Sequence, residues 1–421
     1  YKRQPYNIFY STHADYNGSF NTEKIDPDIN RHKEDSYKSR INRLSWINNI
    51  EWQSENQTSF FNSLSFNSSV SFSKDKVDEV RYNSLSRAMA APNSNEAGEH
   101  DGVFLPFQFV GTQKVDNRPF GAYVRLTGNF RLFIAKTKQE LKIGTDWQMD
   151  KNFGEGQLYD PLRPVNYTSI STRPRPYNDI PAGHDLSFFA EDYFTLPVST
   201  HTLEISAGVR ASSLLNLPKE YKLHNKFYFD PRVNMKWLFP AFFIGDQKLS
   251  YEIGGGIGWH SMMPSLTQLY PNLLYEDIIQ LNYYHNNPAY RRLQMITYII
   301  DRTNPDLSVA RNFKWEIRGN ITYAENNLSV TYFKENMTSG FRTGTRMLPL
   351  AYKTYDNNSI DATTLDGPPD LNQMTYTQDT LMCIYGITTN GTKLRKTGVE
   401  FQFSSKRIPA LATRILSLIH I

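Results

Sequence analysis

The feature that most constrains this chain is a two-residue hydrophobic period that runs much further than a globular strand requires. Between Phe120 and Lys136 the even positions are apolar or small, whereas the odd positions include two arginines. Successive side chains of a β-strand point to opposite faces, so this segment has one apolar and one mostly polar face. An ordinary strand has only about 5–6 residues. The even positions are Ala122, Val124, Leu126, Gly128, Phe130, Leu132 and Ile134, and the odd positions are Tyr123, Arg125, Thr127, Asn129, Arg131 and Phe133.

The same alternation recurs along the chain and predicts about twelve strands, counted with the period-2 principle. The other segments lie at 44–52, 60–72, 141–150, 185–196, 203–210, 232–239, 249–260, 313–323, 328–332, 399–403 and 411–421.

The connections between these strands alternate in length. Short turns are predicted at 54–57, 137–138, 197–200, 240–246, 325–327 and 406–409, and long polar segments at 75–119, 151–182, 215–225, 262–311 and 343–393. This alternation is typical of an antiparallel up-and-down transmembrane β-barrel with short periplasmic turns and long extracellular loops. A soluble β-sandwich is the alternative, but it has no reason to keep every second connection long. We expect residues 1–37 to be a polar segment or loop and residues 38–421 to form the barrel.

Composition agrees with a barrel once it is divided between the two faces. Hydrophobic residues make up 39% of the 421, and the longest apolar stretch, Trp237–Gly245, contains a proline. A spanning helix needs about 20 apolar residues, so a helical membrane protein is excluded. The mean hydropathy of −0.55 then averages a lipid face with a polar lumen and long polar loops. The formal net charge of +4 is too small and dispersed for a nucleic-acid partner.

Several motifs carry a family resemblance. HSMMPSLTQLYP (His260–Pro271) follows a glycine-rich strand, and NPDLSVARNFKWEIRG (Asn304–Gly319) opens the next one. FFAEDYFTLP (Phe188–Pro197), LEISAGVR (Leu203–Arg210) and FDPRVNMKW (Phe229–Trp237) precede them in order. Together these segments resemble the barrel of TonB-dependent outer-membrane receptors, particularly those of Bacteroidetes type.

The resemblance implies a receptor in the bacterial outer membrane that captures a scarce solute and imports it with energy from TonB. A siderophore, cobalamin, a glycan or a peptide would each fit as the ligand. The implied partners are outer-membrane lipid, a plug domain, the TonB complex and a small-molecule or oligomer ligand. The family barrel has 22 strands, so we expect a partial barrel, with the plug and signal peptide outside these residues. A self-contained 12-stranded barrel acting as a passive channel or hydrolase is the alternative.

Candidate site residues fall in two groups, and neither is catalytic. Ligand capture is expected from aromatic and basic residues of the 262–311 loop, which could instead simply pack over the barrel mouth. These residues are Tyr270, Tyr275, Tyr283, Tyr284, Arg291 and Arg292. Charged residues of the polar face are expected to meet the plug or one another, and they are Arg125, Arg131, Glu204, Arg210, Glu252, Glu316 and Arg318.

No cofactor or metal is predicted. The run GGGIG (Gly254–Gly258) lies in a strand pattern with no following helix, so it is not a phosphate loop. The histidines His13, His100, His201, His260 and His285 lack paired metal-ligand spacing. Cys383 is the single cysteine, which excludes an internal disulfide.

Overall fold

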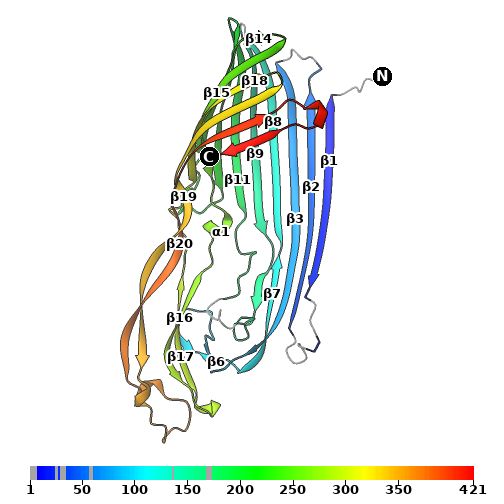
Figure 1. The fold of residues 1–421 in the computed structure, drawn as a ribbon. Helices are drawn as coiled ribbons and strands as arrows, with labels where there is room; N and C mark the ends of the chain where they lie inside the picture. Colours follow the sequence, from blue (N-terminus) through cyan, green and yellow to red (C-terminus); the bar gives the residue numbers. More distant parts are fainter. Residues whose placement is uncertain (1–6, 24–26, 29–34, 56–59, 135–136, 167–172) are drawn as a thin grey trace.

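The computed structural model describes all residues except 1–6, 24–26, 29–34, 56–59, 135–136 and 167–172. Its main feature is one antiparallel sheet of long strands, which confirms the predicted all-β up-and-down class (Figure 1). Thirteen of its strands follow one another in an unbroken order, β1-β2-β3-β8-β9-β11-β12-β13-β15-β18-β19-β20-β21. Among the described residues, no helix is long and apolar enough to cross a membrane.

The strands of this order are β1 (Ile8–Thr22), β2 (Ser36–Gln53), β3 (Phe61–Ser84), β8 (Pro119–Ile134), β9 (Thr137–Asn152), β11 (Gly183–Val198), β12 (His201–Leu215), β13 (Tyr228–Leu238), β15 (Gln247–Met262), β18 (Ala310–Tyr323), β19 (Asn326–Tyr355), β20 (Tyr376–Ser404) and β21 (Leu416–His420). Three further strands pair with the same sheet, and they are β7 (Gln108–Asn117), β10 (Gly156–Tyr159) and β14 (Phe242–Ile244).

The remaining elements belong to the loops. Two small sheets contain β16 (Leu274–Tyr283), β17 (Arg292–Ile300) and β5 (Gly98–Asp101) in one, and β4 (Ala90–Ala91) and β6 (Val103–Phe104) in the other. The helical turns are α1 (Leu266–Leu269), η2 (Pro288–Tyr290), η3 (Asn357–Ser359), η4 (Leu371–Gln373) and η5 (Pro409–Leu411).

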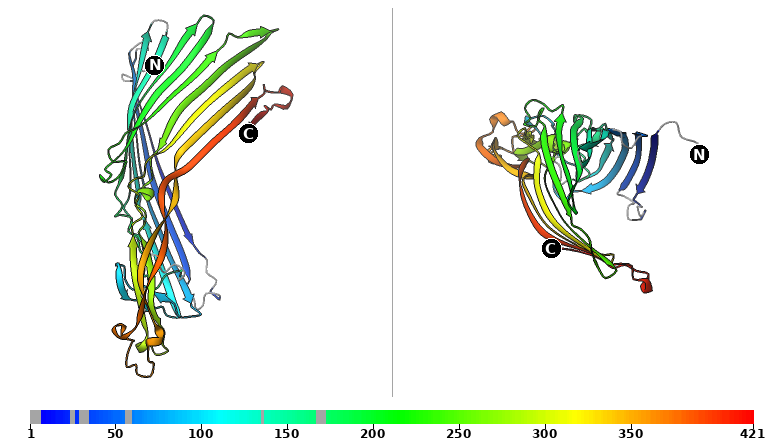
Figure 2. Two further views of the ribbon diagram at one scale, coloured as in Figure 1. Left: turned by 90° about the vertical axis from the view of Figure 1, so that its left-hand side faces the viewer. Right: turned by 90° about the horizontal axis from the view of Figure 1, so that it is seen from above.

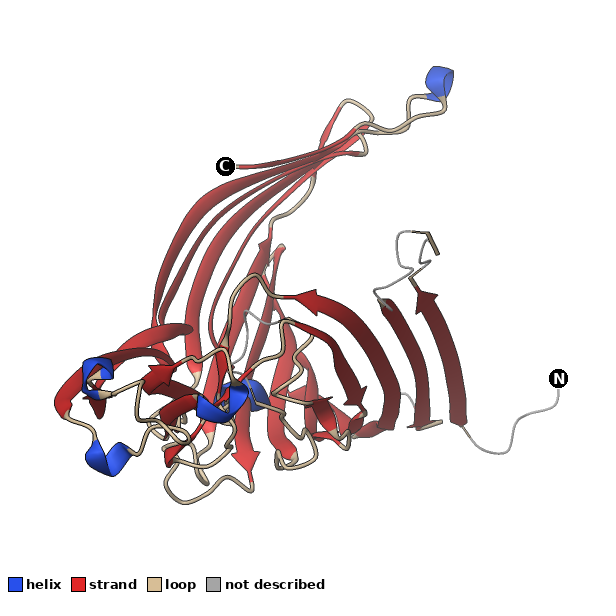
Figure 3. Ribbon diagram, turned by 90° about the horizontal axis from the view of Figure 1, so that it is seen from below, coloured by secondary structure: helices blue, strands red, loops and turns tan. Residues whose placement is uncertain are grey.

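Viewed from above and from below, the large sheet curves like part of a cylinder wall (Figures 2 and 3). The described strands β1 and β21 are its two edges and do not pair with each other, so the sheet is open. A self-contained closed barrel of these strands is therefore not observed.

The alternate apolar residues of the strands lie on one solvent-facing surface of the large sheet, which is a single layer. Leu126 is 42% exposed and Ile317 is 52% exposed, and apolar residues of neighbouring strands share the same face. In a soluble sandwich a second sheet would cover that face. The described residues provide no such sheet, which argues against the sandwich.

Two sequence expectations need correction. Residues 1–37 were expected to form a polar segment, but Ile8–Thr22 is strand β1, paired along its length with β2. Its alternation was missed because Asp15, Asn17 and other polar residues dominate it. Most of the segment 343–393, which was expected to be a long loop, is strand, since β19 and β20 pair with each other out to Tyr355 and Tyr376. These strands continue as a narrow ribbon beyond the rest of the sheet (Figure 1).

The turns predicted at 197–200 and 325–327 overlap turns of the structure, whereas the turn predicted at 137–138 does not. Tight turns follow β11 at Ser199–Thr200 and β18 at Ala324–Glu325, and Ser199, Ala324 and Glu325 have positive φ. Residues 56–57 of the turn predicted at 54–57 lie outside the described residues. The predicted turn 137–138 is already part of β9, and the preceding residues 135–136 also lie outside the described residues.

Candidate ligand-binding site

The polar face of the sheet carries a charge cluster built around Asp146. Arg125 Nη2 on β8 lies 3.2 Å from Asp146 Oδ2, and Arg210 Nη2 on β12 lies 2.7 Å from Oδ1. The ring of Phe189 on β11 lies beneath both guanidinium groups, at 5.4 Å and 5.9 Å. Asp146 is buried, and its negative charge is compensated by these two guanidinium groups.

The contact between Arg210 and Asp146 also shows which way the sheet curves. It crosses the intervening strand β11, and Arg232 on β13 similarly crosses β12 to reach Glu191 at 2.9 Å. Strands two apart in a sheet are separated by about 10 Å, and side chains converge over such a gap on a concave face. We therefore assign the alternate polar residues of the strands to the concave face of the sheet and the alternate apolar residues to the convex face.

A second charge cluster lies further along the same face. Lys236 on β13 is 3.1 Å from Glu252 and 3.7 Å from Glu204, and Arg318 is 4.0 Å from Glu252. Glu316 pairs with Lys314 at 3.0 Å. Arg131 lies opposite Glu140 in the strand register, and both line a hollow of about 290 Å³. The expected lumen residues thus largely meet one another, and contact with a plug stays a prediction.

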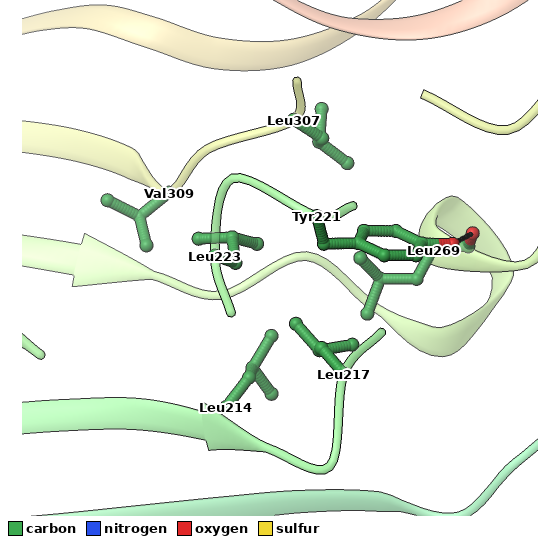
Figure 4. Close-up of a cluster of buried hydrophobic side chains, with 7 residues drawn as sticks. All are labelled: Leu214, Leu217, Tyr221, Leu223, Leu269, Leu307 and Val309. Carbon is green, nitrogen blue, oxygen red and sulfur yellow. Dashed lines mark hydrogen bonds between the residues drawn. The ribbon is translucent and has the colours of Figure 1, made fainter. Parts of the chain in front are cut away.

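The largest buried apolar cluster among the described residues lies mainly in the loops. Loops that follow β12, β15 and β17 pack around the fully buried Leu307 (Figure 4). The cluster comprises Leu214, Leu217, Tyr221, Leu223, Leu269, Leu307 and Val309. Within it the Tyr221 hydroxyl donates to the Leu269 carbonyl at 2.8 Å, and burial raises the pKa of Tyr221 to about 12.

The same loops are tied to the ribbon. Asn304 Nδ2 donates to the Thr388 carbonyl at 2.7 Å, and Asn390 Oδ1 accepts from the Ser308 amide at 2.8 Å. Asparagine at such positions replaces the backbone pairing that irregular loops lack. The loop end is therefore a packed unit with defined walls.

A cavity of about 480 Å³ opens beside this unit, within the usual range for small-molecule sites. Its walls come from four separate parts of the chain, at 157, 173–181, 270–275 and 302. Two of the predicted ligand residues, Tyr270 and Tyr275, line it, and so do four prolines, Pro174, Pro176, Pro181 and Pro271. Proline fixes its own φ, so these walls lose little freedom when a ligand binds.

Three arginines line this cavity, and the sequence analysis missed all of them. Arg173 and Arg175 alternate with prolines in the run RPRP, and Arg302 follows β17. The RPRP run is a signal that could have been used, because it places two cations on a stiff segment. Nothing local predicts that Arg302, more than 120 residues later, joins them.

The backbone of Arg175 is held by strand β10. The Gln157 amide donates to the Arg175 carbonyl at 3.0 Å, and the Arg175 amide donates to the Gln157 carbonyl at 3.2 Å. Gly156 makes this approach possible, since it has φ +84° and a Cβ there would lie 1.9 Å from the Arg175 carbonyl oxygen. Only glycine satisfies both conditions.

The other predicted loop residues lie away from this cavity. Tyr283, Tyr284, Arg291 and Arg292 are at the tip of the β16–β17 hairpin. Arg291 stacks 4.2 Å above the Tyr284 ring and donates to its hydroxyl at 2.9 Å, whereas Arg292 pairs with Asp101 of β5 at 2.9 Å. Tyr283 packs against Leu281, Tyr355 and Met374. The six residues therefore do not form one site.

The described part of the chain shows no group of three His, Cys, Asp or Glu side chains placed to hold a metal ion.

Comparison with known proteins adds a fold relationship. No family model matches the chain, and no curated protein matches it in sequence. The structure of the RagAB peptide transporter is similar over 94% of this chain and 37% of that one, with TM-score 0.50 and 10% identity. The siderophore receptor PirA from Pseudomonas aeruginosa covers 100% of this chain and 67% of its own, with TM-score 0.41 and 12% identity. The ferric enterobactin receptor of the same organism covers 95% and 56%, with TM-score 0.44 and 13% identity.

The RagAB likeness shows the fold. This chain spans little more than a third of the length of the RagAB chain to which it is similar.

Proposed function

We propose that this chain is a large part of the barrel of an outer-membrane receptor that binds an extracellular solute and imports it. The observation that carries the proposal is the division of one curved sheet into an exposed apolar convex face and a concave face of paired charges. Such a sheet suits hydrocarbon on one side and a polar plug or solute on the other.

The loop end supports a receptor more than an open channel. Long connections gather at the end of the sheet opposite the tight turns (Figure 1), and they pack into a unit with its own cavity. The fold likeness to the RagAB peptide transporter is consistent with this role. The sequence resemblance adds TonB as the source of energy, a plug domain as the moving part and the outer membrane as the location.

The solute class follows from this proposal only in outline. A peptide is the cargo named for RagAB, and siderophores are the ligands named for the two receptors. We carry both over as candidates. Catalysis is not part of the proposal.

Cell fractionation tests the location. We expect the full protein in the outer-membrane fraction, released only by detergent and migrating differently on gels with and without heating. A protein that is soluble and monomeric without detergent would overturn the proposal. Uptake measured in cells with and without TonB then tests the energy source, because unchanged uptake without TonB would exclude it.

A further inference from the structure

The three arginines of the 480 Å³ cavity have different partners, and the difference points to a ligand. Arg173 is paired with a carboxylate. Its Nη2 lies 2.9 and 3.1 Å from the two oxygens of Asp277, donates to the Ser94 carbonyl at 3.1 Å, and its guanidinium stacks 4.9 Å from the Tyr275 ring. The side chains of Arg173 and Asp277 are 4% and 6% exposed. This pair is a buried structural link between two loops.

Arg175 and Arg302 have no such counter-ion. Arg175 Nη2 donates to the Tyr270 carbonyl at 2.6 Å, and Arg302 Nε donates to the Asn272 carbonyl at 2.9 Å. Both carbonyls belong to one short wall of the cavity, and in the described part of the chain no salt bridge joins either arginine to a carboxylate. Most of their N–H donors are therefore left for another acceptor.

The charge of Arg302 acts on the nearby Arg175. Burial lowers the pKa of Arg175, and the nearby charge of Arg302 lowers it further. Arginine does not lose its proton in proteins. Two half-buried like charges lining one cavity repel each other, and an anion between them would relieve that repulsion. The single carboxylate in the cavity wall, Asp179, is exposed.

We propose that this cavity binds an organic oxyanion, held by Arg175 and Arg302, with its apolar body against Tyr270, Tyr275 and the prolines. Guanidinium groups match the spacing of carboxylate and phosphoryl oxygens, and either group would satisfy the site. That such a ligand is the imported solute rests on the proposed receptor function, whereas binding itself does not.

The test is a titration of the full protein, purified in detergent, with benzoate, phenyl phosphate and the neutral analogue benzamide. We expect calorimetry to show binding of one or both anions and at least tenfold weaker binding of benzamide. Stronger binding of benzoate would identify a carboxylate ligand, and stronger binding of phenyl phosphate a phosphoryl ligand. Each Arg→Gln change at 175 or 302 should weaken anion binding about tenfold or more, as expected for a lost charged hydrogen bond.

Arg163→Gln is the matched control, because Arg163 is exposed and lies outside the cavity wall. Arg302→Lys keeps the charge. It replaces Arg302→Gln in the titration if the glutamine variant fails to fold, as judged by gel mobility without heating. Anion binding that is absent, equalled by benzamide, or unchanged in both glutamine variants would overturn the proposal. If anion binding is not found but the protein is in the outer-membrane fraction, the oxyanion proposal is wrong while the proposed receptor function is retained.

Discussion

The concave face of the sheet and the cavity at the loop end both carry arginines, but they use them in opposite ways. On the sheet, Arg125 and Arg210 converge on one buried carboxylate, Asp146, across neighbouring strands. At the loop end, Arg175 and Arg302 hold main-chain carbonyls and have no carboxylate partner in the described residues. The sheet wall satisfies its own charges, while the loop cavity keeps charge available for a ligand.

The loop unit must be rigid for this contrast to hold, and the largest expected effect tests its core. Leu307→Ala removes a side chain with no exposure and should destabilise the loop unit by about 2–5 kcal/mol. Hydrogen–deuterium exchange at the amides of the cluster would measure this as lost protection. Leu273→Ala is the control, since Leu273 is 48% exposed. Equal loss of protection in the two variants would mean that the loops do not form a cooperative unit.

The second effect concerns the two faces of the sheet. Leu126→Arg puts charge on the convex face and should cost about 2–4 kcal/mol if the site lies mid-membrane. Gln148→Arg puts the same side chain on the concave face, where Asp146 also lies, and should change the free energy of unfolding by less than about 0.5 kcal/mol. Denaturant unfolding in lipid vesicles compares them. If Gln148→Arg were the more damaging variant, the assignment of the faces would be reversed.

The third effect tests whether the sheet charges compensate one another. Asp146→Asn removes the shared anion of Arg125 and Arg210 and should cost about 1–2 kcal/mol, because both guanidinium groups are partly solvated. The same unfolding measurement applies, with Glu316→Gln as the control because its pair with Lys314 is more exposed. A stable Asp146→Asn protein would show that the cluster contributes nothing to the wall.

How far the sequence predicted each region follows from the kind of contact that builds it. Side-chain parity is local, so the alternation around Leu126 identified the correct face and strand. The partner of Arg125 depends on strand register, which the alternation does not specify. The ribbon of β19 and β20 was missed because its residues do not alternate. Thr343–Thr345 is polar, whereas Met347–Tyr352 is a continuous apolar run.

The loop site was predicted less well, because its residues meet only through tertiary packing. Tyr270 and Tyr275 line the cavity, but Arg173 and Arg175 beside them come from a segment far away in sequence. Aromatic and basic content alone could not separate these tyrosines from Tyr283 and Tyr284, which pack elsewhere. Whether any of them binds a ligand stays a prediction.

The smallest expected effect distinguishes the tyrosines of the cavity from those of the hairpin tip. Changing Tyr283 and Tyr284 together to alanine should leave benzoate and phenyl phosphate affinity within about twofold, since the hairpin tip does not line the cavity. Tyr275→Ala should weaken binding several-fold, because it removes an aromatic wall and the ring that stacks on Arg173. Titration of both variants against the parent protein makes the comparison. A loss at the hairpin tip as large as that of Arg175→Gln would move the binding site to the tip, where Arg291 rather than Arg175 would meet the anion.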